Sequence, residues 1–380
     1  MSNIARPFRV DIDQSAIDDL KQRLANSRLP ETQTVDDWSQ GIPLETVQEF
    51  SDYWRHHYDW FACQDRLNRY PQYLIEIDGV DIHFLHIKSP EPSARPLLMT
   101  HGWPGSMLEF IELIGPLTNP TKYGGSAEDA YHLVLPSLPG YGFSAKPTSV
   151  GWSTEKIASA WDSLMVNIGY HRYFAQGGDW GGVVTASIGA QNLGHCAGIH
   201  LNLVVVGPPD MDIVKAPTPD EVKALTQYQK YLKEGAAYAA IQGTRPQTIG
   251  YALADSPIGQ MAWILEKFHQ WSSPDALQKN FSKDHLLDNI SLYWLSNSAA
   301  SSARLYWHSF AKSDLSEVTL PTGASIFENE LIQPSRRWAE QRFKNIQFWQ
   351  ENKGGGHFAA MELPELFVQQ LRECFRGMKL

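Results

Sequence analysis

The chain has 380 residues, which is long for one simple domain and short for three, so we expect one large domain with an insertion or appendage. With 43% hydrophobic and 19% charged residues the composition is globular, and the formal charge of −10 argues against nucleic acid or an anionic membrane as the main partner. The cysteines lie far apart, and no apolar run reaches about 18 residues, the length that a membrane helix needs. These features argue against a disulfide-rich scaffold and predict a soluble cytoplasmic protein without a membrane anchor.

Residues 1–72 have the pattern of amphipathic helices. Ile17, Leu20 and Leu24 recur at helical spacing, and the segment 43–61 (PLETVQEFSDYWRHHYDWF) repeats the pattern. These helices carry too few apolar residues to form a core of their own. We therefore expect an N-terminal helical extension that packs on the core.

A β-rich pattern begins at Tyr73. Two runs flank Asp78-Gly79, a dipeptide typical of a two-residue hairpin turn. Short apolar runs then alternate with helical segments, which indicates an α/β fold with a mostly parallel sheet covered by helices on both faces. The runs that we expect to be strands are 97–100, 132–135, 173–176, 199–206, 324–327 and 346–349.

The alternation stops between residues 208 and 310, where the sequence is almost entirely helical. A helical block between strands of one sheet is most simply an inserted lid. We expect an α/β core formed by residues 73–207 and 311–380, with a lid formed by residues 208–310.

The segment 176–181 (QGGDWG) has the G-x-nucleophile-x-G spacing of a nucleophile elbow, with Asp179 where serine is usual. A serine that attacks a saturated carbon leaves an ether, which water does not cleave under mild conditions. A carboxylate leaves an ester, whose carbonyl water can attack to regenerate the aspartate. An aspartate at this turn therefore predicts displacement at a saturated carbon; the alternative is an aspartate that merely caps the next helix.

A general base for that water is present late in the chain. His357 follows the last expected strand on a glycine-rich loop, and nucleophile, acid and histidine occur in that order in hydrolases of this type. Glu328 and Glu330 both follow the first strand after the lid, where an acid would orient the imidazole. Their spacing does not choose between them.

The leaving oxygen and the ester carbonyl also need hydrogen-bond donors. The segment 101–105 (HGWPG) is similar to an oxyanion loop, so the backbone N–H groups of Trp103 and Trp180 are candidates for an oxyanion hole, and we interpret His101 as bracing this loop. Lid tyrosines are candidate donors to the leaving oxygen, because a phenol stays protonated at neutral pH. The pattern does not choose among Tyr228, Tyr231, Tyr238, Tyr251, Tyr293 and Tyr306.

Together these motifs resemble those of the microsomal type of epoxide hydrolase, an enzyme with the α/β-hydrolase fold. The resemblance runs nearly end to end and is carried by YWRHHYDWFACQDRLNRYP, HGWPGS, PSLPGYGFS, QGGDWG, DSPIGQMAWILEKF, PTGASIFENELIQP and GGHFAAMELPEL. It implies that Asp179 is the nucleophile, His357 the base and Glu330, rather than Glu328, the acid. It further implies that Tyr238 and Tyr306 hold the epoxide oxygen.

The resemblance also implies a cofactor-free enzyme that acts on a small apolar epoxide with water. Unlike the membrane-bound members, the chain has no apolar anchor ahead of ARPFRV, and it is compatible with a homo-oligomer. Two alternatives stay open. A haloalkane dehalogenase would use the same aspartate with Trp or Asn donors for the halide, and a pseudoenzyme would use the lidded pocket only to bind an apolar ligand.

Overall fold

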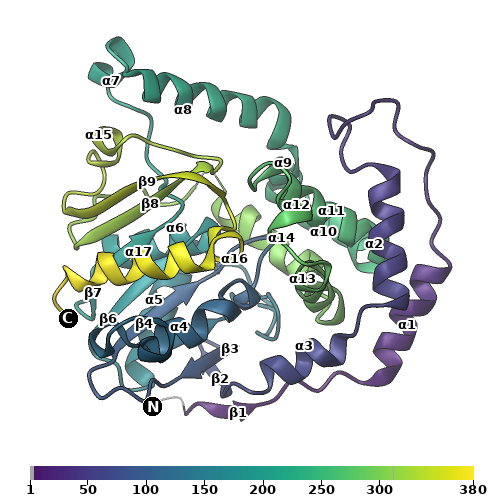
Figure 1. Cartoon of the computed structure of the whole chain (residues 1–380), viewed down its shortest axis with the longest axis horizontal. Coiled ribbons are helices and arrows are strands. Elements are labelled where there is room, and N and C mark those ends of the chain that lie inside the picture. Colours follow the sequence, from purple (N-terminus) through teal and green to yellow (C-terminus); the bar gives the residue numbers. More distant parts are fainter. Residues whose placement is uncertain (1–3, 311) are drawn as a thin grey trace.

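A computed structural model describes residues 4–310 and 312–380 (Figure 1). Within these residues a nine-stranded sheet has the order β1-β2-β3-β5-β4-β6-β7-β8-β9. The pairs from β5 through β9 are parallel, whereas β1, β2 and β3 are antiparallel to their neighbours. The strands are β1 (Arg6–Phe8), β2 (Gln72–Ile77), β3 (Val80–Ile87), β4 (Arg95–Thr100), β5 (Tyr131–Pro136), β6 (Tyr173–Gly177), β7 (Cys196–Leu201), β8 (Thr322–Asn329) and β9 (Ile346–Gly356).

The predicted hairpin is confirmed, with β2 and β3 joined at Asp78 and Gly79, which both have positive φ. Two strands differ from the expectation. β7 ends at Leu201 rather than at residue 206, because the chain leaves the sheet after the backbone N–H of Asn202 donates to the carbonyl of Gly177. β1 lies where the sequence predicted only helices, and its Pro7 is tolerated because β1 is an edge strand.

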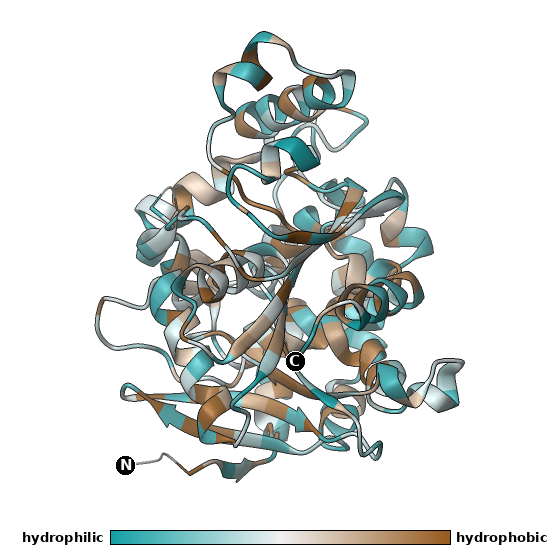
Figure 2. Ribbon diagram, turned by 90° about the vertical axis from the view of Figure 1, so that its left-hand side faces the viewer, coloured by the Kyte–Doolittle hydropathy of each residue, from teal (hydrophilic) through white to brown (hydrophobic). Residues whose placement is uncertain are grey.

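Helices cover both faces of the sheet. Figure 1 shows α17 (Pro364–Arg376) in front of the strands, with α5 (Thr154–Asn167) and α6 (Asp179–Gln191) behind them. The central strands β4, β5, β6 and β7 are mostly hydrophobic and buried on both faces, and brown ribbon runs through the centre of Figure 2. The shorter helices of the core are η1 (Met107–Leu113), α4 (Ile114–Thr118), η2 (Pro120–Tyr123), η3 (Ala127–Asp129), α15 (Arg336–Ala339) and α16 (Ala359–Glu362).

The N-terminal helices are α1 (Gln14–Ala25), α2 (Leu44–His56) and α3 (Trp60–Leu67). The apolar stripe of Ile17, Leu20 and Leu24 is buried, as its spacing predicted. These helices contact helices that lie between β7 and β8: α1 and α2 touch α11, and α3 touches α13. The extension thus adds a strand to the core sheet and packs its helices against the segment that we expect to be the lid.

All helices between β7 and β8 fall within residues 208–310. They are α7 (Met211–Lys215), α8 (Pro219–Lys230), the π-helical turn η4 (Tyr231–Gly235), α9 (Ala237–Thr244), α10 (Pro246–Asp255), α11 (Pro257–Gln270), α12 (Ala276–Lys279), α13 (Lys283–Leu295) and α14 (Ala299–Ser309). In Figure 1, α7 and α8 stand apart from the group formed by α9 to α14.

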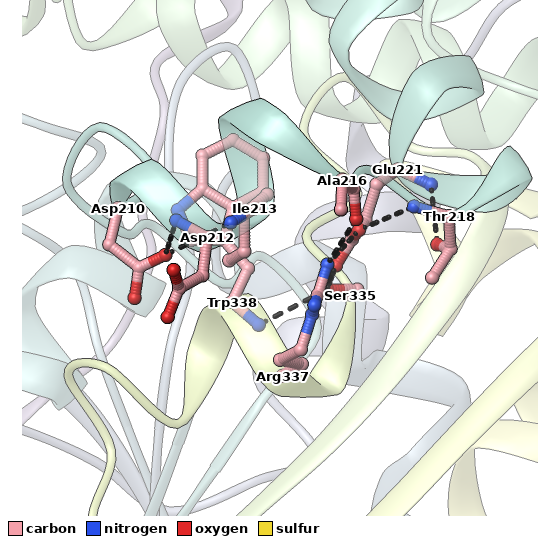
Figure 3. A network of polar contacts seen from close by, with 9 residues as sticks. All are labelled: Asp210, Asp212, Ile213, Ala216, Thr218, Glu221, Ser335, Arg337 and Trp338. Carbon is pink, nitrogen blue, oxygen red and sulfur yellow. Dashed lines mark hydrogen bonds and ion pairs between the residues drawn. The ribbon is translucent and has the colours of Figure 1, made fainter.

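A buried carboxylate joins the start of α8 to the core. Thr218 and Glu221 form a capping box at its first turn, and the buried Glu221 carboxylate also accepts hydrogen bonds from Arg337 Nη2 at 2.6 Å and Ser335 Oγ at 2.6 Å (Figure 3). The guanidinium and the hydroxyl lower the pKa of Glu221 to about 2. Through this contact α15 fixes the start of the helix that leads to Tyr228 and η4.

Candidate active site

The nucleophile turn predicted at Asp179 joins β6 to α6. Asp179 has φ 50°, a left-handed conformation that few residues other than glycine adopt, so the turn is strained. A Cβ at Gly177 would lie 2.0 Å from the carbonyl oxygen of Gly181, and one at Gly181 would lie 1.8 Å from the carbonyl oxygen of Thr100. Only glycine fits at these two positions, because strand, turn and helix pack backbone to backbone.

The carboxylate of Asp179 lies between the HGWPG loop and the last histidine of the chain. The backbone N–H of Trp103 donates to Asp179 Oδ1 at 2.7 Å, and His357 Nε2 lies 3.2 Å from Oδ2. Trp180 directly follows Asp179 and is the second residue of α6, so its N–H has no acceptor within the helix. The geometry thus brings together the four residues that the sequence singled out around the nucleophile.

His357 also contacts one of the two candidate acids. Its Nδ1 lies 2.8 Å from Glu330 Oε1, and both side chains are buried. Glu328, by contrast, accepts from the backbone N–H of Gly354 at 3.0 Å and lies 3.9 Å from Lys223 on the half-exposed outer side. The alternation of side chains around the end of β8 therefore turns only one of the two carboxylates toward the imidazole.

Two opposing effects act on His357. Burial disfavours the charged imidazolium, but the carboxylates of Glu330 and Asp179 outweigh it and hold the pKa of His357 well above its ordinary value. The backbone also fixes the ring, because the N–H of His357 donates to the carbonyl of Trp271 at 2.8 Å. In the free protein the two neighbouring carboxylates therefore favour the protonated form of the imidazole.

Tyr238 on α9 and Tyr306 on α14 lie over the opposite side of Asp179. Their rings are 5.7 Å apart; Tyr238 stacks on Trp103 at 5.2 Å, and Tyr306 meets Trp180 edge-on at 4.8 Å. Burial raises the pKa of each phenol well above its ordinary value, so both stay protonated.

Both tyrosines line a cavity of about 340 Å³ that reaches Asp179 and His357. The rest of its wall is largely apolar and includes Val183, Leu203, Val205, Phe310, Leu315 and Leu331. A small apolar molecule that enters this cavity meets a carboxylate at one side and two phenols at the other.

The sequence matches two family profiles. One is described as "Epoxide hydrolase N terminus" and covers residues 5–110, and the other is described as "alpha/beta hydrolase fold" and covers residues 95–242. A relative from Stigmatella aurantiaca is 50% identical over 376 residues, which cover 98% of this chain and 85% of the relative. "Epoxide hydrolase 1" of Sus scrofa is 34% identical over 403 residues, with 98% and 88% covered. The chain belongs to the epoxide hydrolase family.

Solved structures agree with this assignment to the epoxide hydrolase family. The juvenile hormone epoxide hydrolase of the silkworm Bombyx mori superposes with a TM-score of 0.91 at 30% identity, covering 98% of this chain and 94% of that one. The Aspergillus niger epoxide hydrolase has a TM-score of 0.90 at 32% identity, with 100% and 97% covered. The α/β-hydrolase fold expected from the sequence is confirmed.

In this family member His101 joins two loops beside the site. Its Nε2 accepts from the backbone N–H of Leu138 at 3.2 Å, and its Nδ1 donates to the carbonyl of Gly102 at 2.9 Å. Burial lowers the pKa of His101 to about 4, which keeps the imidazole neutral so that one nitrogen accepts while the other donates. His101 therefore braces the HGWPG loop, as its sequence position suggested.

Two further side chains reach the site without having been singled out from the sequence. Tyr231, in the π-helical turn η4, was only one of several lid tyrosines, and a local π-helix has no reliable sequence signal. Glu109, in η1, lines a small cavity together with Asp179 and His357. Its place eight residues after His101 carries no pattern that marks it.

Among residues 4–310 and 312–380, no group of three or more His, Cys, Asp or Glu side chains is arranged to hold a metal ion. No helix in the same part of the chain is both long and apolar enough to cross a bilayer.

Proposed function

We propose that this member of the family converts small apolar epoxides to vicinal diols through a covalent ester on Asp179. The observation that carries the proposal is the position of the Asp179 carboxylate, which lies between the Trp103 N–H and His357 and borders the cavity lined by Tyr238 and Tyr306. The largely apolar wall of that cavity favours an apolar epoxide. Membership of the family supports the reaction class independently of this geometry.

In the first step, Asp179 Oδ2 attacks a ring carbon, because Oδ1 is already engaged by the Trp103 N–H. The bond between that carbon and the ring oxygen breaks, and its electron pair stays on the oxygen. Tyr238 and Tyr306 donate hydrogen bonds to this oxygen as charge develops on it. A carboxylate needs no general base for this attack.

In the second step, His357 takes a proton from water, and the hydroxide adds to the carboxyl carbon of the ester. The resulting oxyanion accepts from the N–H groups of Trp103 and Trp180. The bond from that carbon to the diol oxygen then breaks, and the imidazolium of His357 gives its proton to that oxygen. The second proton of the water leaves the Asp179 carboxyl group, and the oxygen held by the tyrosines since the first step takes up one proton, so the diol leaves neutral and Asp179 is again a carboxylate. Glu330 orients the imidazole and stabilises its cation throughout.

Ester formation itself prepares His357 for its role. The negative charge of Asp179 contributes to the raised pKa of His357 and disappears when the carboxylate is alkylated. The imidazole can then lose its proton and act as a base. The proposed lid of residues 208–310 supplies the two tyrosines and excludes bulk water from the ester.

A single turnover in ¹⁸O-water tests the mechanism. Enzyme in excess over styrene oxide should give an unlabelled diol, with ¹⁸O appearing in the peptide that contains Asp179. A diol labelled in the first turnover would mean that water attacks the epoxide directly, and would overturn the covalent mechanism.

One observation favours a second candidate activity, displacement of halide from a haloalkane. Among the described residues, Trp180 Nε1 is a buried indole N–H without a hydrogen-bond partner, and Trp180 lines the same cavity. An indole N–H there could donate to a departing halide. Chloride or bromide release from 1-haloalkanes tests this activity, and Tyr306→Phe separates the two reactions because only epoxide opening uses the phenol.

A further inference from the structure

Behind Asp179, on the side away from the tyrosines, lies a second and much smaller cavity. It has a volume of about 10 Å³, roughly the space that one buried water requires, and its polar wall includes Glu109, Asp179, Asn202 and His357. Asp179 and His357 are the residues that it shares with the large cavity. The nucleophile and the base thus separate a site suited to the epoxide from a site suited to a single water.

Two glycines of the HGWPG loop make room for two carboxyl groups. A Cβ at Gly102 would lie 2.0 Å from Asp179 Oδ1, and a Cβ at Gly105 would lie 1.5 Å from Glu109 Oε1. Any larger residue at Gly105 would push the Glu109 carboxyl group out of its position. The loop therefore packs closely against both carboxyl groups, that of Glu109 and that of Asp179, and both line the small cavity.

Glu109 is in electrostatic contact with the proposed reaction centre. Burial raises the pKa of Glu109 to about 8; the positive charge of His357 opposes this rise and the carboxylate of Asp179 adds to it. At neutral pH the group is therefore mostly the uncharged acid, which still offers a carbonyl oxygen as a hydrogen-bond acceptor.

Asn202 completes the small cavity. Its side-chain oxygen accepts from Gln176 Nε2 at 2.8 Å, so its NH₂ group remains to donate. A water in the cavity can give one hydrogen to His357 and the other to Glu109, and can accept from Asn202. A water held in this way lies beside the Asp179 carboxyl group, which lines the same cavity.

The geometry points to Glu109 as a positioning residue that holds the hydrolytic water against the ester on Asp179. This inference rests on the covalent mechanism proposed above. Ester formation does not involve the small cavity, so Glu109 acts only on the second step.

Rapid-quench single turnovers with styrene oxide separate the two steps. Glu109→Ala should leave ester formation within about 2-fold of the wild-type rate and slow ester decay by about 10²-fold, because the water loses one of its acceptors. Glu109→Gln keeps a carbonyl acceptor of the same shape and should restore decay to within about 5-fold. Glu112→Ala is the matched control, since Glu112 lies on the same helix, is 56% exposed in its side chain and does not line the small cavity.

The outcomes are distinct. Unchanged decay in Glu109→Ala, or an equal fall of both steps in Glu109→Ala and Glu109→Gln, would overturn the role of Glu109 and leave the covalent mechanism intact. Absence of any ester in the wild type would overturn the covalent mechanism and this inference with it.

Discussion

The phenol oxygens of Tyr231 and Tyr238 lie 3.2 Å apart, within hydrogen-bond distance. Tyr231 belongs to the π-helical turn η4 and Tyr238 to the following helix, and both line the large cavity. The Tyr238 hydroxyl therefore forms a hydrogen bond with a third tyrosine, to which the proposed mechanism gives no role.

Replacing each of the three lid tyrosines should slow ester formation, but to different extents. Tyr238→Phe and Tyr306→Phe each remove a donor to the leaving oxygen and should slow this step by about 10²- to 10³-fold. Tyr231→Phe removes only the partner of Tyr238 and should slow it by about 3- to 10-fold, roughly the effect of one neutral hydrogen bond. Stopped-flow tryptophan fluorescence would follow the step. A loss in Tyr231→Phe as large as that in Tyr238→Phe would mean that Tyr231 itself holds the epoxide oxygen.

Replacing the nucleophile and replacing the base should have different effects on ester formation. Asp179→Ala should show no turnover and no adduct, because nothing is left to attack the ring. His357→Gln should form the ester and keep it, since water is no longer deprotonated. Intact-mass spectrometry after mixing with styrene oxide would show the added mass of one epoxide in His357→Gln alone. An unmodified His357→Gln protein would contradict the order of steps.

The two neighbouring glutamates provide a matched pair. Glu330→Gln keeps the shape of the side chain but removes the charge that stabilises the imidazolium, and should slow ester decay by about 10²- to 10⁴-fold. Glu328→Gln, which faces away from His357, should remain within about 2-fold of wild type, as surface substitutions usually do. Equal effects of the two substitutions on the decay rate would contradict the role of Glu330 as the acid that orients His357.

The pH dependence of the two steps should differ. Attack by Asp179 does not require a neutral imidazole, whereas ester decay does. Glu330 still raises the pKa of His357 after the ester forms, so His357 becomes protonated as the pH falls and decay slows first. Acid quench followed by mass spectrometry should therefore find a larger ester fraction at about pH 5.5 than at about pH 8. A constant ester fraction over this range would contradict the role of His357.

The anchor of α8 should affect stability with a definite sign. Glu221 has a pKa lowered to about 2 from an ordinary value of 4.5, so its contribution is present above 4.5 and is lost as the pH falls from there toward 2. Glu221→Gln should lose about 1–3 kcal/mol of local stability at pH 7, because Arg337 then lacks its charged partner. Limited proteolysis between α7 and η4 measures this loss. Glu340→Gln, whose ion pair with Arg336 is half-exposed, is the control and should cleave like wild type.

Local chemistry explains which parts of the fold were predictable. Asp78-Gly79 favours a tight turn through its own backbone preferences, and Gly177 is needed for a contact with Gly181, four residues away. The choice between Glu328 and Glu330 depends on how β8 ends against the loop of His357, a contact across 27 residues that spacing does not encode. Glu109 reaches the site through the shape of the HGWPG loop, and β1 exists because β2 offers an open edge. Each of these features depends on contacts between residues that are distant in the sequence, so local patterns do not predict it.

Hydrogen bonds from the N-terminal helices hold α13, one of the helices between β7 and β8, in place. Trp54 Nε1 donates to Ser291 Oγ at 2.9 Å, and the hydroxyl of Tyr58 donates to Asp288 at 2.8 Å, which ties α2 and the turn after it to α13. These bonds hold α13 against the N-terminal helices. Leu315 lines the large cavity and is exposed, so we expect epoxides to enter and diols to leave beside this residue.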